Sequence, residues 1–161
     1  QTIAYWMMGS LAGAQWGELA VIAPIIIASI LFFWTQSRVL NLMLLGDESA
    51  ITMGTDLHAY RQWYLLISSL IVGFAVYSAG MIGFVGLIVP HVIRMFTGPD
   101  HKRLLPVAAL VGAIFLVVAD GLCRVIIPHT ELPIGILISM IGAPSFIYLM
   151  IKKTYGFGGS D

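Results

Sequence analysis

Charged residues are scarce in this 161-residue chain. Asp, Glu, Lys and Arg make up 10% of it, against about 25% in an ordinary soluble domain. Hydrophobic residues make up 59%, and the mean hydropathy is +0.95. The composition therefore indicates an integral membrane protein. The formal net charge is zero, and because nucleic-acid binding depends on a surplus of basic residues, no nucleic-acid partner is expected.

The sequence also lacks the patterns from which most catalytic sites are built. Its single cysteine, Cys123, excludes an internal disulfide and a cysteine-based zinc site, and its position in an apolar run favours a packing role. The histidines are scattered, and no HExxH, GxSxG or nucleotide-binding glycine loop occurs. We therefore expect a non-catalytic chain with no metal site and no cofactor of its own.

A starting methionine and a signal peptide are both missing from this sequence. It begins at Gln1 and runs directly into the apolar stretch TIAYWMMG, without the basic start and cleavage site of a secretory signal. We expect further N-terminal spans to precede this start in a larger protein.

Long apolar runs are abundant. Five stand out, at residues 17–36, 62–80, 82–96, 104–127 and 133–151. Four approach the roughly 20 residues that a helix needs to cross a bilayer. The third is short and interrupted by Gly83, Gly86 and Pro90, so we predict a short, tilted or kinked span, which a membrane tolerates only where it is buried in protein or lines a cavity. The predicted fold is an all-α polytopic membrane protein with about five transmembrane helices.

Basic residues divide unevenly between the two sides of this topology. One side receives residues 35–61, residues 97–103 and the C-terminus. It holds Arg38, Arg61, Arg94, Lys102, Arg103, Lys152 and Lys153. The other side has only Arg124 nearby. The positive-inside rule therefore predicts that residues 35–61 and the C-terminus are cytoplasmic.

The longest predicted loop contains a short polar stretch, LLGDESAITMG, at residues 44–54. Gly46 can turn the chain, and Asp47 is a good N-cap. Glu48 suits the positive N-terminus of a helix, and Gly54 fits a C-cap. Two short helices separated by a bend are therefore expected, before a further helix capped by residue 55 or 56.

Two interpretations of this loop are open. It is either a connector that lies on the membrane surface or a docking element for a cytoplasmic partner. In the second case, exposed apolar side chains would anchor the partner and the acids would form a polar rim. The candidate anchors are Leu44, Leu45, Ile51 and Met53.

Two opposite charges lie inside one apolar run. Asp120 and Arg124 are four residues apart, so they share a helix face and can compensate each other. The pattern fits a structural ion pair near the outer interface, and it also fits presentation of Arg124 to an acidic group on an external partner.

Small residues recur in two places, at Gly80, Gly83 and Gly86 and at Ser139, Gly142 and Ala143. Such positions allow close contact between helices. One interpretation is helix packing within one subunit. The other is a role in lining a pathway or in forming a subunit interface.

Six blocks of the sequence carry a family resemblance. They are YWMMGS, LNLMLLGDESAITMG, GFVGLIVPHVIR, GPDHKRLLP, ADGLCR and ELPIGILISMIGAPSFIYL, in this order. With them the chain resembles the FecCD-type permeases, the membrane subunits of type II ABC importers for ferric siderophores, haem and vitamin B12. The resemblance covers residues 5–153 and matches the C-terminal half of a permease that normally has about ten spans.

This resemblance implies a transport function and several partners. Residues 1–161 would belong to a permease that pairs with a second permease subunit, as a homodimer, among the lipids of the inner (cytoplasmic) membrane. Two ATPase subunits, which hold ATP and magnesium, would dock on the cytoplasmic face. An extracytoplasmic binding protein would deliver a ferric siderophore or a haem-type iron complex, with vitamin B12 (cobalamin) as the alternative substrate.

The resemblance also implies specific site residues. The ATPase-coupling segment would be residues 39–56. Its docking residues would be Leu44, Leu45, Gly46, Asp47, Glu48, Ala50, Ile51, Met53 and Gly54. Arg124 matches the family's arginine that pairs with a glutamate of the binding protein. The outer substrate entrance would be flanked by Tyr5, Trp6, Met7, Glu131 and Pro133.

Functions of other classes are disfavoured. A channel that acts without an ATPase would need no docking segment and would show a continuous polar pore lining, which the sequence lacks. An intramembrane enzyme would need catalytic groups that are missing. Under the implied mechanism, closure of the ATPase pair moves residues 44–54, and the spans rock so that the pathway opens to the other side.

Overall fold

The computed structural model describes residues 2–126 and 132–156, and every regular element in these ranges is a helix. In chain order they are α1 (Thr2–Met7), α2 (Trp16–Thr35), α3 (Ser37–Leu45), α4 (Asp47–Thr52), α5 (Leu57–Ala79), α6 (Val85–Thr97), α7 (His101–Ile126) and α8 (Ile134–Gly156). Four of them, α2, α5, α7 and α8, are long and apolar enough to cross a membrane. The predicted all-α membrane fold is confirmed.

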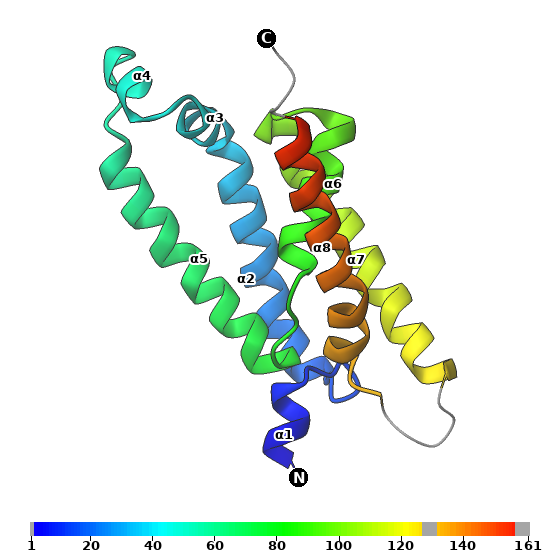
Figure 1. Cartoon of the computed structure of the whole chain (residues 1–161). Coiled ribbons are helices and arrows are strands. Elements are labelled where there is room, and N and C mark those ends of the chain that lie inside the picture. The colour runs from blue at the N-terminus through cyan, green and yellow to red at the C-terminus, as the bar shows by residue number, and fades with distance from the viewer. Residues whose placement is uncertain (1, 127–131, 157–161) are drawn as a thin grey trace.

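The two ends of the bundle collect different segments. The short helices α3 and α4, the turn between α6 and α7 and the end of α8 lie at one end, while α1 and the link from α5 to α6 lie at the other (Figure 1). We call these the α4 end and the α1 end. This arrangement matches the alternation of loops that the five apolar runs predict.

The third apolar run forms only a short helix. Gly80 ends α5 with φ +72°, and residues 80–84 are not helical. Phe84, directly before α6, has φ +65°, which is uncommon for a residue with a side chain. The remaining 13 residues of α6 rise only about 20 Å, less than the thickness of a bilayer core. The prediction of a short, interrupted apolar helix is therefore confirmed, and its crossing of the membrane stays a prediction.

Buried side chains are few and lie mainly where α6, α7 and α8 meet. One cluster consists of Ala119, Cys123, Ile134 and Ile138. A second consists of Val89, Ile93 and Leu104. Cys123 is only 3% exposed, so the predicted packing role of this cysteine is confirmed.

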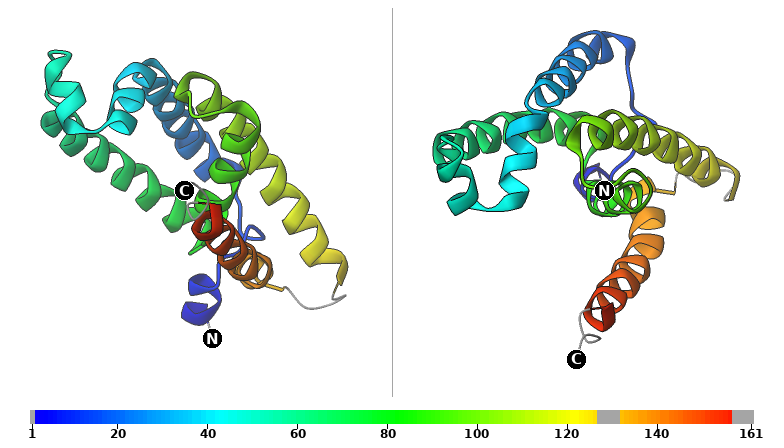
Figure 2. Two further views of the ribbon diagram at one scale, coloured as in Figure 1. Left: turned by 45° about the horizontal axis from the view of Figure 1, so that its top comes forward. Right: turned by 90° about the horizontal axis from the view of Figure 1, so that it is seen from above.

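The outward faces of the long helices are apolar and largely uncovered. In the most hydrophobic stretch of each helix, the share of residues that are buried ranges only from 0% in α2 to 22% in α8. Seen from above, α2, α5, α7 and α8 fan out in different directions instead of closing into a compact bundle (Figure 2). Such faces suit lipid tails or further membrane helices, neither of which competes for hydrogen bonds.

Gly80, Gly83 and Gly86 do not form one helix-packing face within this chain, and the alternative role in a pathway or subunit interface stays a prediction. The first two lie in the non-helical link, and a Cβ added at Gly83 or Gly86 would meet nothing within 4 Å. Gly142 does permit close contact, because a Cβ there would lie 2.7 Å from Cβ of Phe84. The left-handed turn at Phe84 thus packs directly against α8.

Candidate functional site

A sharp bend at Gly46 joins α3 to α4 at the α4 end of the bundle (Figure 1). Gly46 has φ +90° and occupies the position before the first residue of α4, and glycine adopts such a conformation without the penalty that a side chain brings. The predicted N-cap role of Asp47 is therefore wrong. Asp47 is the first helical residue, and its carboxylate is bound elsewhere.

Asp47 forms an ion pair with Arg61 of α5. Its Oδ1 accepts a hydrogen bond from Nη2 of Arg61 at 2.8 Å, and its Oδ2 accepts one from Nη1 at 3.4 Å. The hydrogen bond first and the positive charge second hold the pKa of Asp47 below its ordinary value of 3.8. Because the pKa is depressed, the pair is intact at neutral pH and is lost only as the pH falls through the lowered value. It ties α4 to the start of α5.

The end of α4 is a glycine-based cap. Gly54 has φ +80°, its N–H donates to the carbonyl of Ile51 at 2.9 Å, and the N–H of Thr55 donates to the carbonyl of Ala50 at 2.9 Å. This pair of bonds is the Schellman arrangement, so the predicted role of Gly54 in ending the helix is confirmed. Asp56 then caps α5 by accepting the N–H of His58 at 2.9 Å.

The two short helices expose most of the apolar residues that the sequence singled out. The exposed fractions are 48% for Leu44, 59% for Leu45, 66% for Ile51 and 61% for Met53. We call these four side chains the docking face, after the role that the sequence predicts for them. Ala50, a predicted docking residue, is 0% exposed. It lies on the buried side of α4 and cannot touch a partner, since a six-residue helix must bury one side to stay in place.

At the α1 end, three glycines let backbone segments touch. A Cβ at Gly80 would collide with the carbonyl oxygen of Trp6, and one at Gly135 with that of Met8. Gly9, with φ +74°, lies against the backbone of residue 81. The N–H of Ser10 also donates to the carbonyl of Ala79 at 2.9 Å. The turn after α1 is thereby wedged between the end of α5 and the start of α8.

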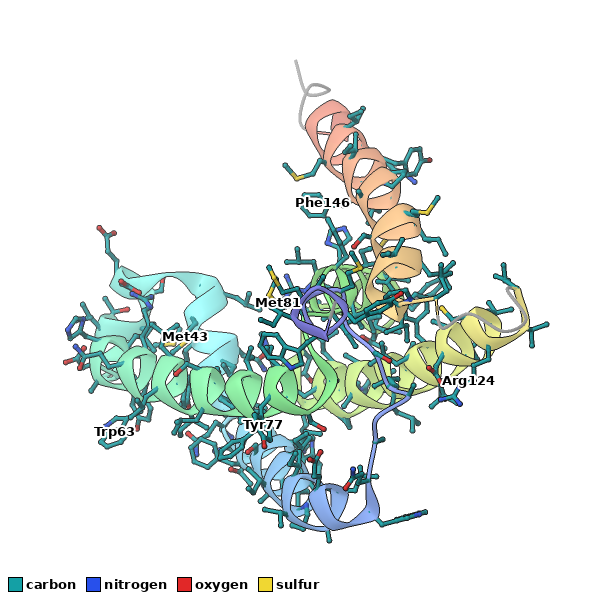
Figure 3. All side chains as sticks on the ribbon, turned by 90° about the horizontal axis from the view of Figure 1, so that it is seen from below. Met43, Trp63, Tyr77, Met81, Arg124 and Phe146 are labelled. Carbon is teal, nitrogen blue, oxygen red and sulfur yellow. The ribbon has the colours of Figure 1, made fainter. Side chains whose placement is uncertain are left out.

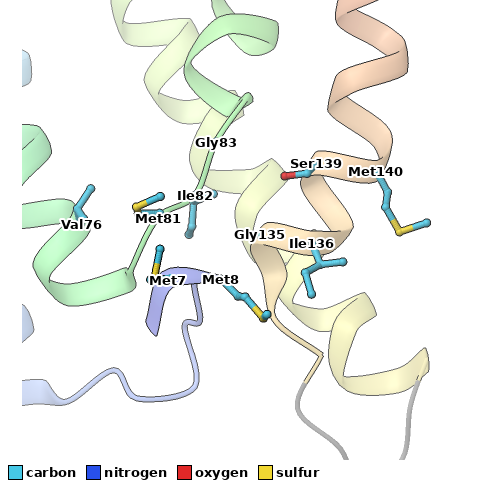
Figure 4. A pocket seen from close by; sticks show the side chains of 10 residues that line it. All are labelled: Met7, Met8, Val76, Met81, Ile82, Gly83, Gly135, Ile136, Ser139 and Met140. Atoms are coloured by element: carbon cyan, nitrogen blue, oxygen red, sulfur yellow. The ribbon is translucent and has the colours of Figure 1, made fainter. Parts of the chain in front are cut away.

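An open cavity of about 680 Å³ lies beside this glycine junction (Figure 4). It is lined by Met7, Met8, Val76, Met81, Ile82, Gly83, Gly135, Ile136, Ser139 and Met140. Four of these are methionines, whose flexible thioether side chains adapt to irregular surfaces. The cavity therefore offers an apolar, adaptable wall with one hydroxyl.

The predicted entrance residues divide between this cavity and a second one. Met7 lines the first. Tyr5, Trp6 and Pro133 line the second, of about 380 Å³, together with Ser10 and residues 78–79. Glu131, the remaining predicted entrance residue, lies outside the described residues. The structure thus brings four of the five predicted residues to the α1 end of the bundle.

Arg124 lies near the end of α7 that faces away from α4. Its Nε donates to Oδ2 of Asp120 at 2.8 Å, so the predicted ion pair within one helix is confirmed. The Arg124 side chain is 61% exposed, against 22% for Asp120, and it lies on the outer surface of α7 (Figure 3). The guanidinium therefore keeps donors available for an external acid. Within residues 2–126 and 132–156, no three His, Cys, Asp or Glu side chains gather as metal ligands would.

A family model of the FecCD transport family matches residues 1–152. The chain belongs to the FecCD transport family. It is 44% identical to the hemin transport system permease protein HmuU of Yersinia pestis over 92% of its own length and 44% of the relative's. It is 43% identical to the cobalamin import system permease protein BtuC of Halobacterium salinarum, over 91% of the chain and 39% of the relative. It is also 43% identical to the Fe(3+) dicitrate transport system permease protein FecD of Escherichia coli, over 91% of the chain and 46% of the relative.

The fold agrees with that of a solved transporter structure. An inward-facing metal-chelate type ABC transporter superposes with a TM-score of 0.87 at 35% identity, covering 94% of this chain and 49% of the other. The chain spans about half the length of the relatives it matches. The family resemblance read from the sequence is confirmed, and the chain is a multi-pass membrane protein.

Proposed function

We propose that this chain forms half of the permease subunit of an ATP-driven importer and that the α3–α4 pair is where an ATPase subunit docks. The observation that carries the proposal is the docking face. The chain belongs to the FecCD family, and its long helices are apolar enough to cross a membrane. At one end of the bundle, a pair of short helices exposes four apolar side chains. Exposed apolar anchors with a polar rim are typical of binding hot spots.

The proposed topology follows the distribution of basic residues. Arg38, Arg61, Arg94 and Lys102 belong to the α4 end, which is therefore assigned to the cytoplasm of a bacterial-type inner membrane. The α1 end, with its two cavities and Arg124, then faces the binding protein. ATP and magnesium are held by the ATPase subunits, and the chain itself performs no chemistry. A second permease subunit, in a homodimer, would cover part of the exposed helix faces.

For the transported substrate we propose a ferric siderophore or a haem-type iron complex, with cobalamin as the alternative. The relatives named for hemin, cobalamin and ferric dicitrate are almost equally similar, at 44%, 43% and 43% identity. The methionine-lined cavity fits a cargo with a large apolar surface, such as a macrocycle, better than a small anion.

Transport by the complete importer tests these assignments. The full permease, its ATPase subunits and its binding protein are reconstituted in vesicles and offered haem, a ferric hydroxamate and cyanocobalamin in turn. ATP-dependent accumulation of one iron complex is expected. Accumulation of cobalamin alone would select the alternative substrate. Equal uptake with and without ATP would instead indicate a channel and overturn the proposal.

The two acids of α4 are expected to differ in importance. Asp47→Lys breaks the ion pair with Arg61 and places two positive charges together, so α4 loses its attachment to α5. Glu48→Lys changes only one charge in the polar rim around the docking face. We expect transport per hydrolysed ATP to fall at least about fivefold with Asp47→Lys and much less with Glu48→Lys. Equal effects in vesicles holding equal amounts of permease would show that the ion pair does not matter.

Charge reversal at Arg124 is expected to weaken docking of the binding protein. Losing one charged partner of an interface pair costs about 2–5 kcal/mol when the pair is desolvated, so we expect the Kd for Arg124→Glu to rise tenfold or more. Asp120→Asn is the matched control, because it breaks the ion pair within α7 but leaves the cation. The Kd is measured on the reconstituted permease, and unchanged affinity of Arg124→Glu would exclude this docking role.

A further inference from the structure

Asn41, in the middle of α3, joins this helix to the turn that begins α7. Its Nδ2 donates to Oδ1 of Asp100 at 2.9 Å. Its Oδ1 accepts the backbone N–H of His101 at 2.9 Å and lies 2.8 Å from Nδ1 of the same residue. Three contacts therefore connect one amide to residues about 60 positions away in the sequence.

The chemistry of the three partners fixes the orientation of this amide. A carboxylate only accepts hydrogen bonds and a backbone N–H only donates them, so Nδ2 must face Asp100 and Oδ1 must face His101. In this arrangement Nδ1 of His101 carries its hydrogen. Aspartate at position 41 would lack the donor, and leucine would lack donor and acceptor alike. Of these three side chains, only asparagine supplies both the donor and the acceptor.

The partners of Asn41 form the beginning of α7. Oδ1 of Asp100 also accepts the N–H of Lys102 at 3.0 Å, as an N-cap does. The hydrogen bond from Asn41 is the main cause that holds the pKa of Asp100 below its ordinary value of 3.8, so this carboxylate is ionised at neutral pH. Nearby, Nε1 of Trp34 donates to the carbonyl of Lys102 at 2.9 Å. The start of α7 is therefore held from both α2 and α3.

We call α3 and α4 the docking helices, and within their own residues the described part of the chain shows two side-chain attachments to the long helices. A further hydrogen bond, from Oη of Tyr64 to Oε1 of Gln36 at 2.8 Å, holds the residue just before α3. The Asp47–Arg61 pair attaches α4 to α5, and both side chains of that pair are about half exposed. The Asn41 cluster attaches α3 to α7. Its two contacts with His101 are partly buried, and its hydrogen bond to Asp100 is exposed. Partly buried hydrogen bonds with several partners hold a geometry more firmly than an exposed ion pair. Through its core contacts, α7 in turn reaches α6 and α8.

We propose that Asn41 is a positioning residue that passes the displacement of the docking helices to α7. This inference rests on the proposed function, since it assumes that an ATPase moves α3 and α4. Closure of the ATPase pair pulls or pushes α3, and the Asn41 cluster carries α7 along with it. Without the cluster, α3 moves while the start of α7 stays behind. ATP is then hydrolysed with little transport.

The test uses the full permease with its ATPase subunits and binding protein in vesicles, and the readout is cargo transported per ATP hydrolysed. Asn41→Leu removes all three contacts at similar volume. We expect ATPase subunits to co-purify as before and ATP hydrolysis to persist, while the transport ratio falls at least about fivefold. Gln62→Leu is the matched control and should keep the ratio. Among the described residues, the Gln62 amide has one hydrogen-bond contact, to His58 in the same helix.

Asp100 supplies a second pair of variants. Asp100→Asn keeps an acceptor for both of its partners and should retain the transport ratio, whereas Asp100→Ala should lower it. Combined with Asn41→Leu, Asp100→Ala should lower the transport ratio no further, because Asn41→Leu has already separated α3 from α7. Loss of the Asp100 cap on the N–H of Lys102 should appear in the melting temperature instead. Additive losses would overturn the inference.

The possible failures are distinguishable. If Asn41→Leu transports at the normal ratio, the inference is wrong and the proposed function stands. If transport, hydrolysis and melting temperature fall together in Asn41→Leu and Asp100→Ala, Asn41 has only a structural role and the inference is wrong. If the unaltered permease retains no ATPase subunit, the proposed function fails and the inference fails with it.

Discussion

Replacing Gly135 with alanine is expected to destabilise the permease by about 3 kcal/mol or more, at the upper end of what an overpacked site costs. The new methyl group would meet the carbonyl oxygen of Met8 and lie 3.1 Å from that of Met81. These are backbone atoms, which cannot turn aside as the end of a flexible side chain can. The turn after α1 would have to separate from α8.

Gly86→Ala is the matched control for this substitution. Both glycines lie in helices, but a Cβ at Gly86 would meet nothing within 4 Å. Alanine is the better helix former, so this change should stabilise by about 0.5–1 kcal/mol. Thermal unfolding of the purified permease in detergent measures both. Equal melting temperatures for the two variants would show that the glycine junction is looser than described.

The second large effect is expected at the docking face. Ile51→Asp places a charge where an apolar anchor would enter the ATPase, and hot-spot losses of about 2 kcal/mol or more correspond to at least about thirtyfold weaker binding. We therefore expect co-purification of the ATPase and ATP-dependent transport to be lost together. Because Ile51 is 66% exposed, the permease itself should fold normally.

Ile51→Leu controls for the change at this position, since it keeps an apolar side chain of equal size. It should retain the ATPase and most of the transport. The melting temperature of both variants should match that of the unaltered permease. Normal ATPase binding by Ile51→Asp would remove Ile51 from the docking face.

The fold could be predicted largely because its cause is local. Long apolar runs form membrane helices, since lipid leaves the backbone no other hydrogen-bond partners. The shortness of α6 followed in the same way from glycines and a proline close together in the sequence. The glycine at the end of α4 was predictable for the same reason, because a cap depends on a few neighbouring residues.

The candidate site was less predictable because its contacts are not local. Asp47 looks like an N-cap by type, but an arginine 14 residues away competes for its carboxylate. The burial of Ala50 depends on how α4 lies against its neighbours, and six residues are too few to show a periodicity. The junction of Gly80 and Gly135 with the turn after α1 joins segments with no shared sequence pattern.

The Asn41 cluster had no signal in the sequence at all. A single asparagine in a short helix gives no indication of its partners, and residues 100 and 101 lie about 60 positions away, at the start of another helix. Asn41 and these two residues come together only because α3 packs against the start of α7 in the folded chain. Such contacts require the fold before they can be recognised.

Attaching a photoreactive side chain at Ile51 shows which protein the docking face touches. Val125 is the matched position, because it is 77% exposed and lies near the opposite end of the bundle. In vesicles carrying the complete importer, light should produce an adduct of permease and ATPase from position 51 and none from position 125. An ATPase adduct from position 125 alone, or none from position 51 in an importer that transports, would contradict docking through α3 and α4.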